Sequence, residues 1–144
     1  MKIVRRKGYV LVVSPWIVYF IGGMMNGAPA RARALACFPC IVVRSENEIA
    51  PWLVNHELIH FRQQIELLFV GTLILHILET MYARLVLKKS AFDSYTWSSN
   101  EQEAYRNQHD SEYLGTRKRW AQFHYLKNKR EFMVGGPGEV VYKN

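Results

Sequence analysis

Apolar residues recur at mostly helical spacing between residues 52 and 68, which predicts an amphipathic helix over this stretch. Pro51 fits the first turn of that helix, because the backbone N–H that proline lacks would have no partner there. The chain stays apolar through residues 64–89, and we expect a buried core helix that continues the first helix or bends away from it at Gly71. Several residues interrupt this run, among them Glu66, His76, Glu79 and Arg84. Its uncharged part, residues 67–75, is shorter than the roughly 20 residues that a membrane span requires.

Shorter patterns predict the elements on either side of this helical centre. Residues 9–13 and 38–44 are apolar and rich in β-branched side chains, so we expect a strand at each. The first strand would be followed by a turn at Ser14-Pro15 and a short buried helix. Residues 113–132 interleave basic and aromatic side chains, which is typical of an amphipathic helix with its aromatics packed inward.

The N-terminal segment, residues 1–36, has two interpretations. Basic residues precede the apolar run 9–23 and the small residues 28–30 follow it, an order that resembles a secretory signal or membrane anchor. Ser14 and Pro15 interrupt the apolar run, which instead favours a strand–turn–helix segment of the folded domain. The sequence leaves both interpretations open.

Length and charge narrow the class of protein. At 144 residues the chain is long enough for one domain with a hydrophobic core. Its net charge of +7 suggests affinity for an anionic partner, such as a membrane surface, nucleic acid or an acidic protein. Charge alone does not choose among these partners.

Residues 56–60 read His-Glu-Leu-Ile-His, the pattern H-E-x-x-H. On an α-helix, residues four apart lie on one face, so His56 and His60 can direct two imidazole nitrogens at one zinc ion. Glu57 lies beside that position and can take a proton from a zinc-bound water. The pattern therefore predicts a zinc site with Glu57 as the catalytic base. The alternative is a pair of core histidines with satisfied hydrogen bonds.

Cys37 and Cys40 offer a second zinc-binding pattern, since C-x-x-C is followed 15 residues later by H-x-x-x-H, within zinc-finger spacing. However, Arg44 stands where a finger has an aromatic core residue, and Pro51 would enter the finger helix. A finger also has no role for Glu57. We therefore favour reduced, partly buried cysteines or a redox pair, and we keep a zinc-binding module with a basic surface as the alternative function.

A third ligand can come from a helix that begins near Ser98. Ser98 and Glu101 have the S-x-x-E spacing of a capping box, which predicts a helix start. Glu103 lies further along this helix and shares a face with Asn107, four residues later. Because a side chain that caps the helix cannot also reach a metal, we favour Glu103 as the ligand, with Glu101 as the competing choice.

Residues 52–67, followed by E-x-E-A-Y at residues 101–105, resemble the gluzincin class of zinc peptidases, of which thermolysin is a familiar member, and small bacterial metallopeptidase-like proteins. The resemblance covers roughly residues 40–125. It implies that the Glu before Ala, here Glu103, completes the metal site, and that the residue four positions later supports a zinc histidine. That residue is Asn107, whose amide oxygen can accept an N–H bond but carries no charge.

These observations predict a mainly α fold with a small β element (α+β), zincin-like, in which the active-site helix precedes a long apolar helix and a second ligand-bearing helix. One metallopeptidase-like domain would span residues 1–132, ahead of a flexible tail at residues 133–144. The group that polarises the scissile carbonyl would be one of three residues: His109, Tyr105 or Tyr113.

The expected function is zinc-dependent hydrolysis of peptide bonds in a peptide or protein substrate. The expected location is cytoplasmic or membrane-associated. Contact of residues 9–23 or 67–87 with a membrane surface is a further expectation, and nucleic acid is the less favoured partner.

Overall fold

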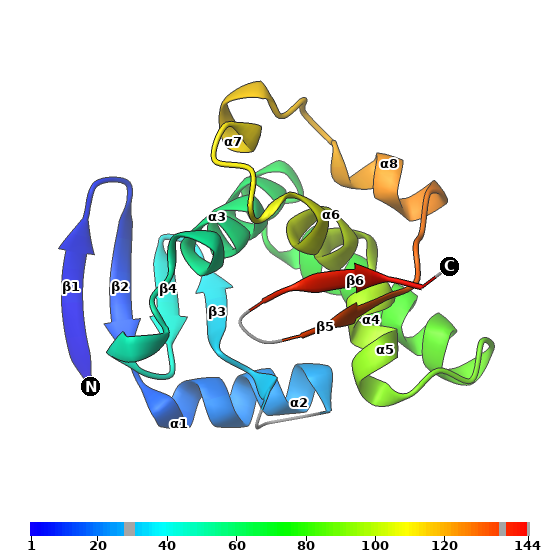
Figure 1. The fold of residues 1–144 in the computed structure, drawn as a ribbon, viewed down its shortest axis with the longest axis horizontal. Helices are drawn as coiled ribbons and strands as arrows, with labels where there is room; N and C mark the ends of the chain where they lie inside the picture. The colour runs from blue at the N-terminus through cyan, green and yellow to red at the C-terminus, as the bar shows by residue number, and fades with distance from the viewer. Residues whose placement is uncertain (28–30, 136–137, 144) are drawn as a thin grey trace.

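A computed structural model describes residues 1–27, 31–135 and 138–143 and shows a mixed α+β fold (Figure 1). Four strands form the larger sheet: β1 (Lys2–Arg6), β2 (Tyr9–Val13), β3 (Ala34–Cys37) and β4 (Cys40–Val43). Their order is β1-β2-β4-β3, with β2 and β4 parallel and the other neighbours antiparallel. The strands expected at residues 9–13 and 38–44 are present as β2 and β4.

The helix that carries the H-E-x-x-H motif, α3, spans Pro51–Glu66 and begins with proline in its first turn, as expected. A short 3₁₀ turn, η3 (Glu46–Glu48), leads into it. Strand β4 lies inside the sheet and is buried on both faces, because its consecutive apolar residues point alternately to either side. Ile41 and Val43 pack with Phe61 of α3, while Val42 packs against the N-terminal helical segment. The sheet thereby holds the motif helix along one face.

The N-terminal helical segment consists of α1 (Pro15–Ile17), a π-helical turn η1 (Val18–Gly22) and α2 (Gly23–Asn26). It follows β2 directly after Ser14, as the strand–turn–helix interpretation predicts. Val18 is completely buried, but Trp16 and Met24 are 72% and 84% exposed, so this helix is not buried all round. Residues 28–30, the small residues of the signal interpretation, lie outside the described residues.

Helix α4 (Val70–Leu85) turns away from α3 by 109° after a short break. The bend lies at Leu68 and Phe69, just before the expected position at Gly71. Both residues have positive φ angles, which bulky residues rarely adopt. Among the described residues no single helix is long and apolar enough to cross a membrane, whereas α3 and α4 together meet the length and composition. The expected buried core helix is buried on one side only, because many apolar residues of α4 are exposed.

Two helices with buried polar residues follow: α5 (Ala91–Trp97) and α6 (Ser99–Asn107). Ser98 is the N-cap of α6, which confirms the predicted helix start. The expected capping box does not form, because the Ser98 hydroxyl donates to the carbonyl of Tyr95 instead of accepting from α6. Residues 99–104 are all buried, although most of them are polar. Such burial costs free energy unless the polar groups find partners, which indicates that α6 serves a site.

The C-terminal part contains two short helices and a hairpin: α7 (Tyr113–Thr116), α8 (Gln122–Lys127), β5 (Phe132–Val134) and β6 (Val140–Tyr142). These replace the single amphipathic helix expected over residues 113–132. Trp120 interrupts the helical backbone with a φ of 61°, and Trp120 and Phe123 are partly exposed instead of packed inward. Strands β5 and β6 fall largely within residues 133–144, where a flexible tail was expected, and residues 136, 137 and 144 lie outside the described residues.

Candidate metal centre

Helices α3 and α6 bring together three potential metal ligands, His56, His60 and Glu101, as a buried cluster. The Nε2 atoms of the two histidines lie 3.1 Å apart. Glu101 approaches both, with Oε1 at 3.2 Å from Nε2 of His60 and Oε2 at 3.5 Å from Nε2 of His56. Ligand atoms of a tetrahedral zinc ion lie about 3.3 Å apart when the metal–ligand bonds are about 2.0 Å. The three atoms therefore surround a point at which a metal ion could bind.

The environment of one carboxylate oxygen of Glu101 is evidence that the cluster suits a cation. The Oε2 atom of Glu101 is buried and forms no hydrogen bond with the described residues, the Nε2 atom of His56 being 3.5 Å away. A buried acceptor without a partner costs about 1–3 kcal/mol, and more when it is charged, so native structures rarely leave one. Two imidazoles and one carboxylate are nitrogen and oxygen ligands of the kind that zinc accepts.

The charges of the cluster also favour a cation. Burial lowers the pKa of His60, but the carboxylate of Glu101 outweighs burial and raises it to about 9. Burial raises the pKa of Glu101, whereas His60 and His56 hold it well below its ordinary value. The cluster therefore stabilises positive charge at the point where its ligand atoms meet.

Gln63 fixes the orientation of His60. Its Oε1 atom lies 2.8 Å from Nδ1 of His60, and its Nε2 donates to the carbonyl of Asn100 and to Oε2 of Glu103. Because the amide nitrogen faces two acceptors, the amide oxygen faces the histidine, and Nδ1 of His60 is the ring nitrogen that carries a proton toward it. Nε2 of His60 is then directed into the cluster, as a metal ligand requires.

Gln108 holds His56 in the same way. Nδ1 of His56 lies 2.9 Å from Oε1 of Gln108, whose Nε2 donates to the carbonyl of Gly138 between β5 and β6. With Nδ1 of each histidine bonded to an amide oxygen, the two Nε2 atoms face each other. Without a metal, the raised pKa of His60 places a proton on its Nε2, which can then be shared with His56 or Glu101. A metal ion can take the place of that proton, because both Nε2 atoms are directed at the same point.

Glu103, the ligand favoured from the sequence, points away from the histidines. Its buried carboxylate binds Arg117, with Oε1 at 2.5 Å from Nε, and accepts a hydrogen bond from Gln63. Residues two apart on an α-helix point about 200° apart, so Glu101 and Glu103 reach different residues of α3: Glu101 reaches His60, and Glu103 reaches Gln63. Glu101 takes the position proposed for Glu103. Glu103 instead acts one step further out, where it orients the glutamine that orients a histidine.

Asn107, the expected support for a zinc histidine, does not contact the histidines either. Its Nδ2 donates to the carbonyl of Glu103 and to the hydroxyl of Tyr125. Gln63 and Gln108 occupy that role, and both were missed at the level of sequence. Gln63 carries a usable signal, because it lies one helical turn after the second histidine of the motif.

Among the three candidates for polarising a carbonyl, Tyr105 is the one that packs against a ligand of the cluster. The centroid of its ring lies 4.7 Å from that of His56, with the two rings edge to face. His109 packs instead against Trp52, and the hydroxyl of Tyr113 donates to a carboxylate oxygen of Glu103.

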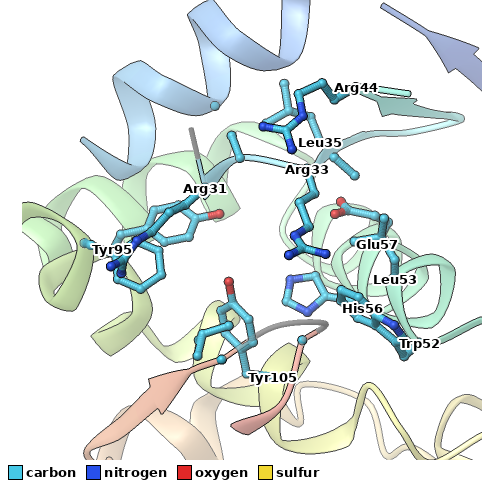
Figure 2. Close-up of a pocket in the computed structure, with 17 residues that line it drawn as sticks. Arg31, Arg33, Leu35, Arg44, Trp52, Leu53, His56, Glu57, Tyr95 and Tyr105 are labelled. Carbon is cyan, nitrogen blue, oxygen red and sulfur yellow. The ribbon is translucent and has the colours of Figure 1, made fainter. Parts of the chain in front are cut away.

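A pocket of about 310 Å³ opens beside the cluster (Figure 2). His56 and Glu57 form part of its wall, and the hydroxyl groups of Tyr95 and Tyr105 point into it. Burial raises the pKa of Glu57, and the charges of the two histidines only partly oppose this. Glu57 has no ion-pair partner among the described residues. A carboxylate in this position can accept a proton from a water molecule in the pocket.

The cysteines and the remaining buried histidine lie outside the cluster. Cys37 and Cys40 are free thiols that face each other across the β3–β4 turn. Within the part of the chain that the structure describes, His56, His60 and Glu101 form the group arranged to hold a metal, and neither cysteine belongs to it. His76 is buried on α4, at hydrogen-bond distance from the side chains of Ser98 and Asn100.

Comparisons of the chain with protein-family models, with curated proteins and with solved structures gave no match. The function proposed for this protein therefore rests on the geometry of the cluster and its pocket.

Proposed function

We propose that the protein is a zinc-dependent metallopeptidase with a zincin-like fold, which hydrolyses peptide bonds in a peptide or protein substrate. The observation that carries this proposal is the position of Glu57. It follows the ligand His56 on α3 and lines a pocket that opens beside the buried cluster. A purely structural zinc site is closed by four protein ligands and needs neither an adjacent carboxylate nor an open pocket.

Zinc is the ion that best suits this ligand set. His56, His60 and Glu101 would hold it, and two imidazoles with one carboxylate leave one of four positions open, as in catalytic zinc sites. When bound, zinc supplies Lewis acidity, which lowers the pKa of a coordinated water and polarises a carbonyl group.

The residues of the pocket then have separate tasks. Glu57 accepts a proton from the attacking water and passes it to the leaving amine. The Tyr105 hydroxyl donates a hydrogen bond to the oxygen of the scissile carbonyl as negative charge develops on it. Gln63 and Gln108 keep the two ligand histidines in the orientation that metal binding requires.

The test measures peptide cleavage and zinc content on the same samples. Zinc-loaded protein is incubated with a diverse peptide mixture, and the products are identified by mass spectrometry. We expect cleavage by the wild type and a roughly 10²–10⁴-fold loss in Glu57→Gln, with zinc content unchanged. The exposed Glu112→Gln variant is the matched control and should cleave normally. A fully zinc-loaded wild type that cleaves nothing contradicts the peptidase and favours a zinc-binding module without catalysis.

A further inference from the structure

Two arginines line the pocket beside the candidate metal centre. Arg31 and Arg33 lie in the segment that leads into β3, across the pocket from the α3 residues His56 and Glu57. Figure 2 shows the side chain of Arg33 extending toward His56, and Arg31 running past Tyr95. Binding of the metal requires neither arginine, so their position in the pocket calls for another partner.

The side chains of these two arginines contact aromatic rings. Neither takes part in an ion pair among the described residues. Instead, Cζ of Arg31 lies 4.5 Å from the centroid of the Phe92 ring, and Cζ of Arg33 lies 6.0 Å from that of Trp52. Contact with an aromatic face holds a guanidinium in place and leaves its N–H donors for a ligand. Arg44, a third arginine of this pocket, differs because it is ion-paired with a glutamate of η3.

We propose that Arg31 and Arg33 form a subsite that binds a carboxylate of the peptide substrate, close to the bond that is cut. This inference rests on the proposed function. A guanidinium binds a carboxylate through two parallel N–H···O bonds, which gives both affinity and orientation. The carboxylate belongs either to an acidic side chain or to a free C-terminus, and both present the same group. A basic side chain at this position would be repelled by the two arginines.

The experiment measures binding apart from cleavage. Alanine-rich hexapeptides that carry an uncharged fluorophore at the N-terminus are prepared with Glu or Gln at the third position, each with a free or an amidated C-terminus. Their affinity for zinc-loaded Glu57→Gln protein is measured by fluorescence anisotropy. We expect a carboxylate-bearing peptide to bind about tenfold more tightly than the fully neutral one, as for one charged hydrogen-bonded contact. The Glu/Gln pair and the free/amidated pair show which of the two carboxylates is recognised.

Variants locate the effect. In the same background, Arg33→Gln and Arg31→Gln should abolish most of the preference, and Arg33→Lys should retain part of it because the charge remains. Arg130→Gln is the matched control, since Arg130 lies 5.6 Å from the Tyr142 ring centroid but outside this pocket. Equal binding of charged and neutral peptides, or an unchanged preference in the Arg31/Arg33 double variant with an unchanged melting temperature, overturns the subsite. If the zinc-loaded wild type cleaves no peptide but the binding preference for a carboxylate is observed, only the proposed peptidase activity is contradicted.

A second, independent observation concerns helix α4, whose amphipathic pattern is inverted. Small or polar residues face the protein interior: Thr72, His76, Glu79 and Ala83. Apolar residues at helical spacing occupy the outer side and are 42–60% exposed: Val70, Leu73, Ile74, Ile77, Leu78, Met81, Tyr82 and Leu85. We call this row the α4 stripe. A continuous exposed apolar row of this length is typical of an interaction surface.

The charges around the α4 stripe are positive. Arg84 and Lys88 lie at its C-terminal end, and both are exposed. The acidic residues between positions 62 and 89 are Glu66 and Glu79, and both are ion-paired with basic residues of the C-terminal part of the chain. An anionic surface therefore complements this end of the stripe.

We infer that the α4 stripe binds a membrane that contains anionic lipids, with α4 in the plane of the interface. The apolar side chains would enter the boundary between headgroups and acyl chains, while Arg84 and Lys88 contact lipid phosphates. A second copy of the chain is a poorer partner, because its own stripe is apolar and offers no negative charge to these two basic residues.

Cosedimentation with vesicles tests this inference. Zinc-loaded wild type should bind vesicles of equal parts phosphatidylcholine and phosphatidylglycerol at least about tenfold more tightly than phosphatidylcholine alone. The Ile74→Glu, Leu78→Glu double variant should lose binding, whereas Ile3→Glu on β1, equally exposed at 60%, should not. Absence of wild-type binding, or binding unchanged in the double variant, overturns the inference. A dimer in sedimentation velocity that the double variant abolishes, without vesicle binding, would assign the stripe to a second copy.

Discussion

His60 and Gln63 lie one helical turn apart on α3, and the amide oxygen of Gln63 is 2.8 Å from Nδ1 of the histidine. The amide nitrogen of the same glutamine is held by Glu103, whose carboxylate is held in turn by Arg117. The candidate metal centre is therefore supported by a buried chain of polar groups that extends from α3 through α6 to the end of α7.

This chain of contacts predicts that Gln63 tunes metal affinity without touching the metal. Replacing it by leucine leaves Nδ1 of His60 without its acceptor, so zinc affinity should fall about 10–100-fold. Asn107→Ala is the control, because Asn107 contacts neither histidine and its replacement should leave zinc affinity within about twofold. Competition with a chelator of known affinity measures both. Equal zinc affinities for the two variants would contradict the role of Gln63.

Replacing Glu101 should mainly weaken zinc binding, whereas replacing Glu103 should mainly lower the stability of the fold. Glu101→Gln removes a ligand and should sharply weaken zinc binding. Glu103→Gln leaves the ligands in place but deprives buried Arg117 of one partner, so it should lower the free energy of unfolding by about 3 kcal/mol and affect zinc affinity less. Chelator competition and chemical denaturation on both variants provide the comparison. A larger loss of zinc affinity in Glu103→Gln would return the ligand to that residue.

The part of the site that lies on α3 is readable from the sequence because it depends on local geometry. His56 and His60 share a face of any helix that contains them, and Glu57 is their neighbour on that helix. Which residue of α6 joins them is a different kind of question. Glu101 and Glu103 lie on the same helix, and the choice depends on the angle at which α6 packs against α3. The spacing of residues in the sequence does not determine this packing angle.

Helix α4 shows the same limit for the fold. Its composition predicts a helix, and the helix is present, but the sequence pattern favoured burial of its apolar residues. The structure buries His76 and Glu79 instead, because these polar groups find partners on α6 and in the C-terminal part. Burial of polar groups becomes predictable only when the partners are known.

The two histidines and the two cysteines should respond oppositely to substitution. His56→Ala or His60→Ala removes a ligand of the buried cluster, so the bound zinc, about one per chain in the wild type, should be lost. Cys37→Ser and Cys40→Ser should leave zinc content nearly unchanged, because neither thiol belongs to the cluster. Elemental analysis of the purified variants measures their zinc content and so distinguishes the buried cluster from a cysteine-containing site. Zinc loss in either cysteine variant, with zinc retained in Glu101→Gln, would favour the finger-like site.

Replacing Tyr105 and Tyr113 one at a time distinguishes a hydroxyl that acts in catalysis from one that only stabilises the fold. Tyr105 lines the pocket and packs against His56, and its hydroxyl points into the pocket (Figure 2). Tyr113 donates instead to Glu103 at 3.0 Å, away from the pocket. Removing a donor that stabilises charge only in the transition state lowers kcat and leaves KM largely unchanged. Tyr105→Phe should therefore lower kcat about 10²–10³-fold with zinc content intact.

Tyr113→Phe removes the same atom from the other tyrosine, so it is the matched control and should lower thermal stability while kcat stays within about twofold. Steady-state kinetics on a peptide that the wild type cleaves, with zinc content and melting temperature recorded for each variant, makes the comparison. If Tyr105→Phe keeps wild-type kcat, the carbonyl is polarised by another group. Tyr95, whose hydroxyl points into the same pocket, is then the next residue to replace.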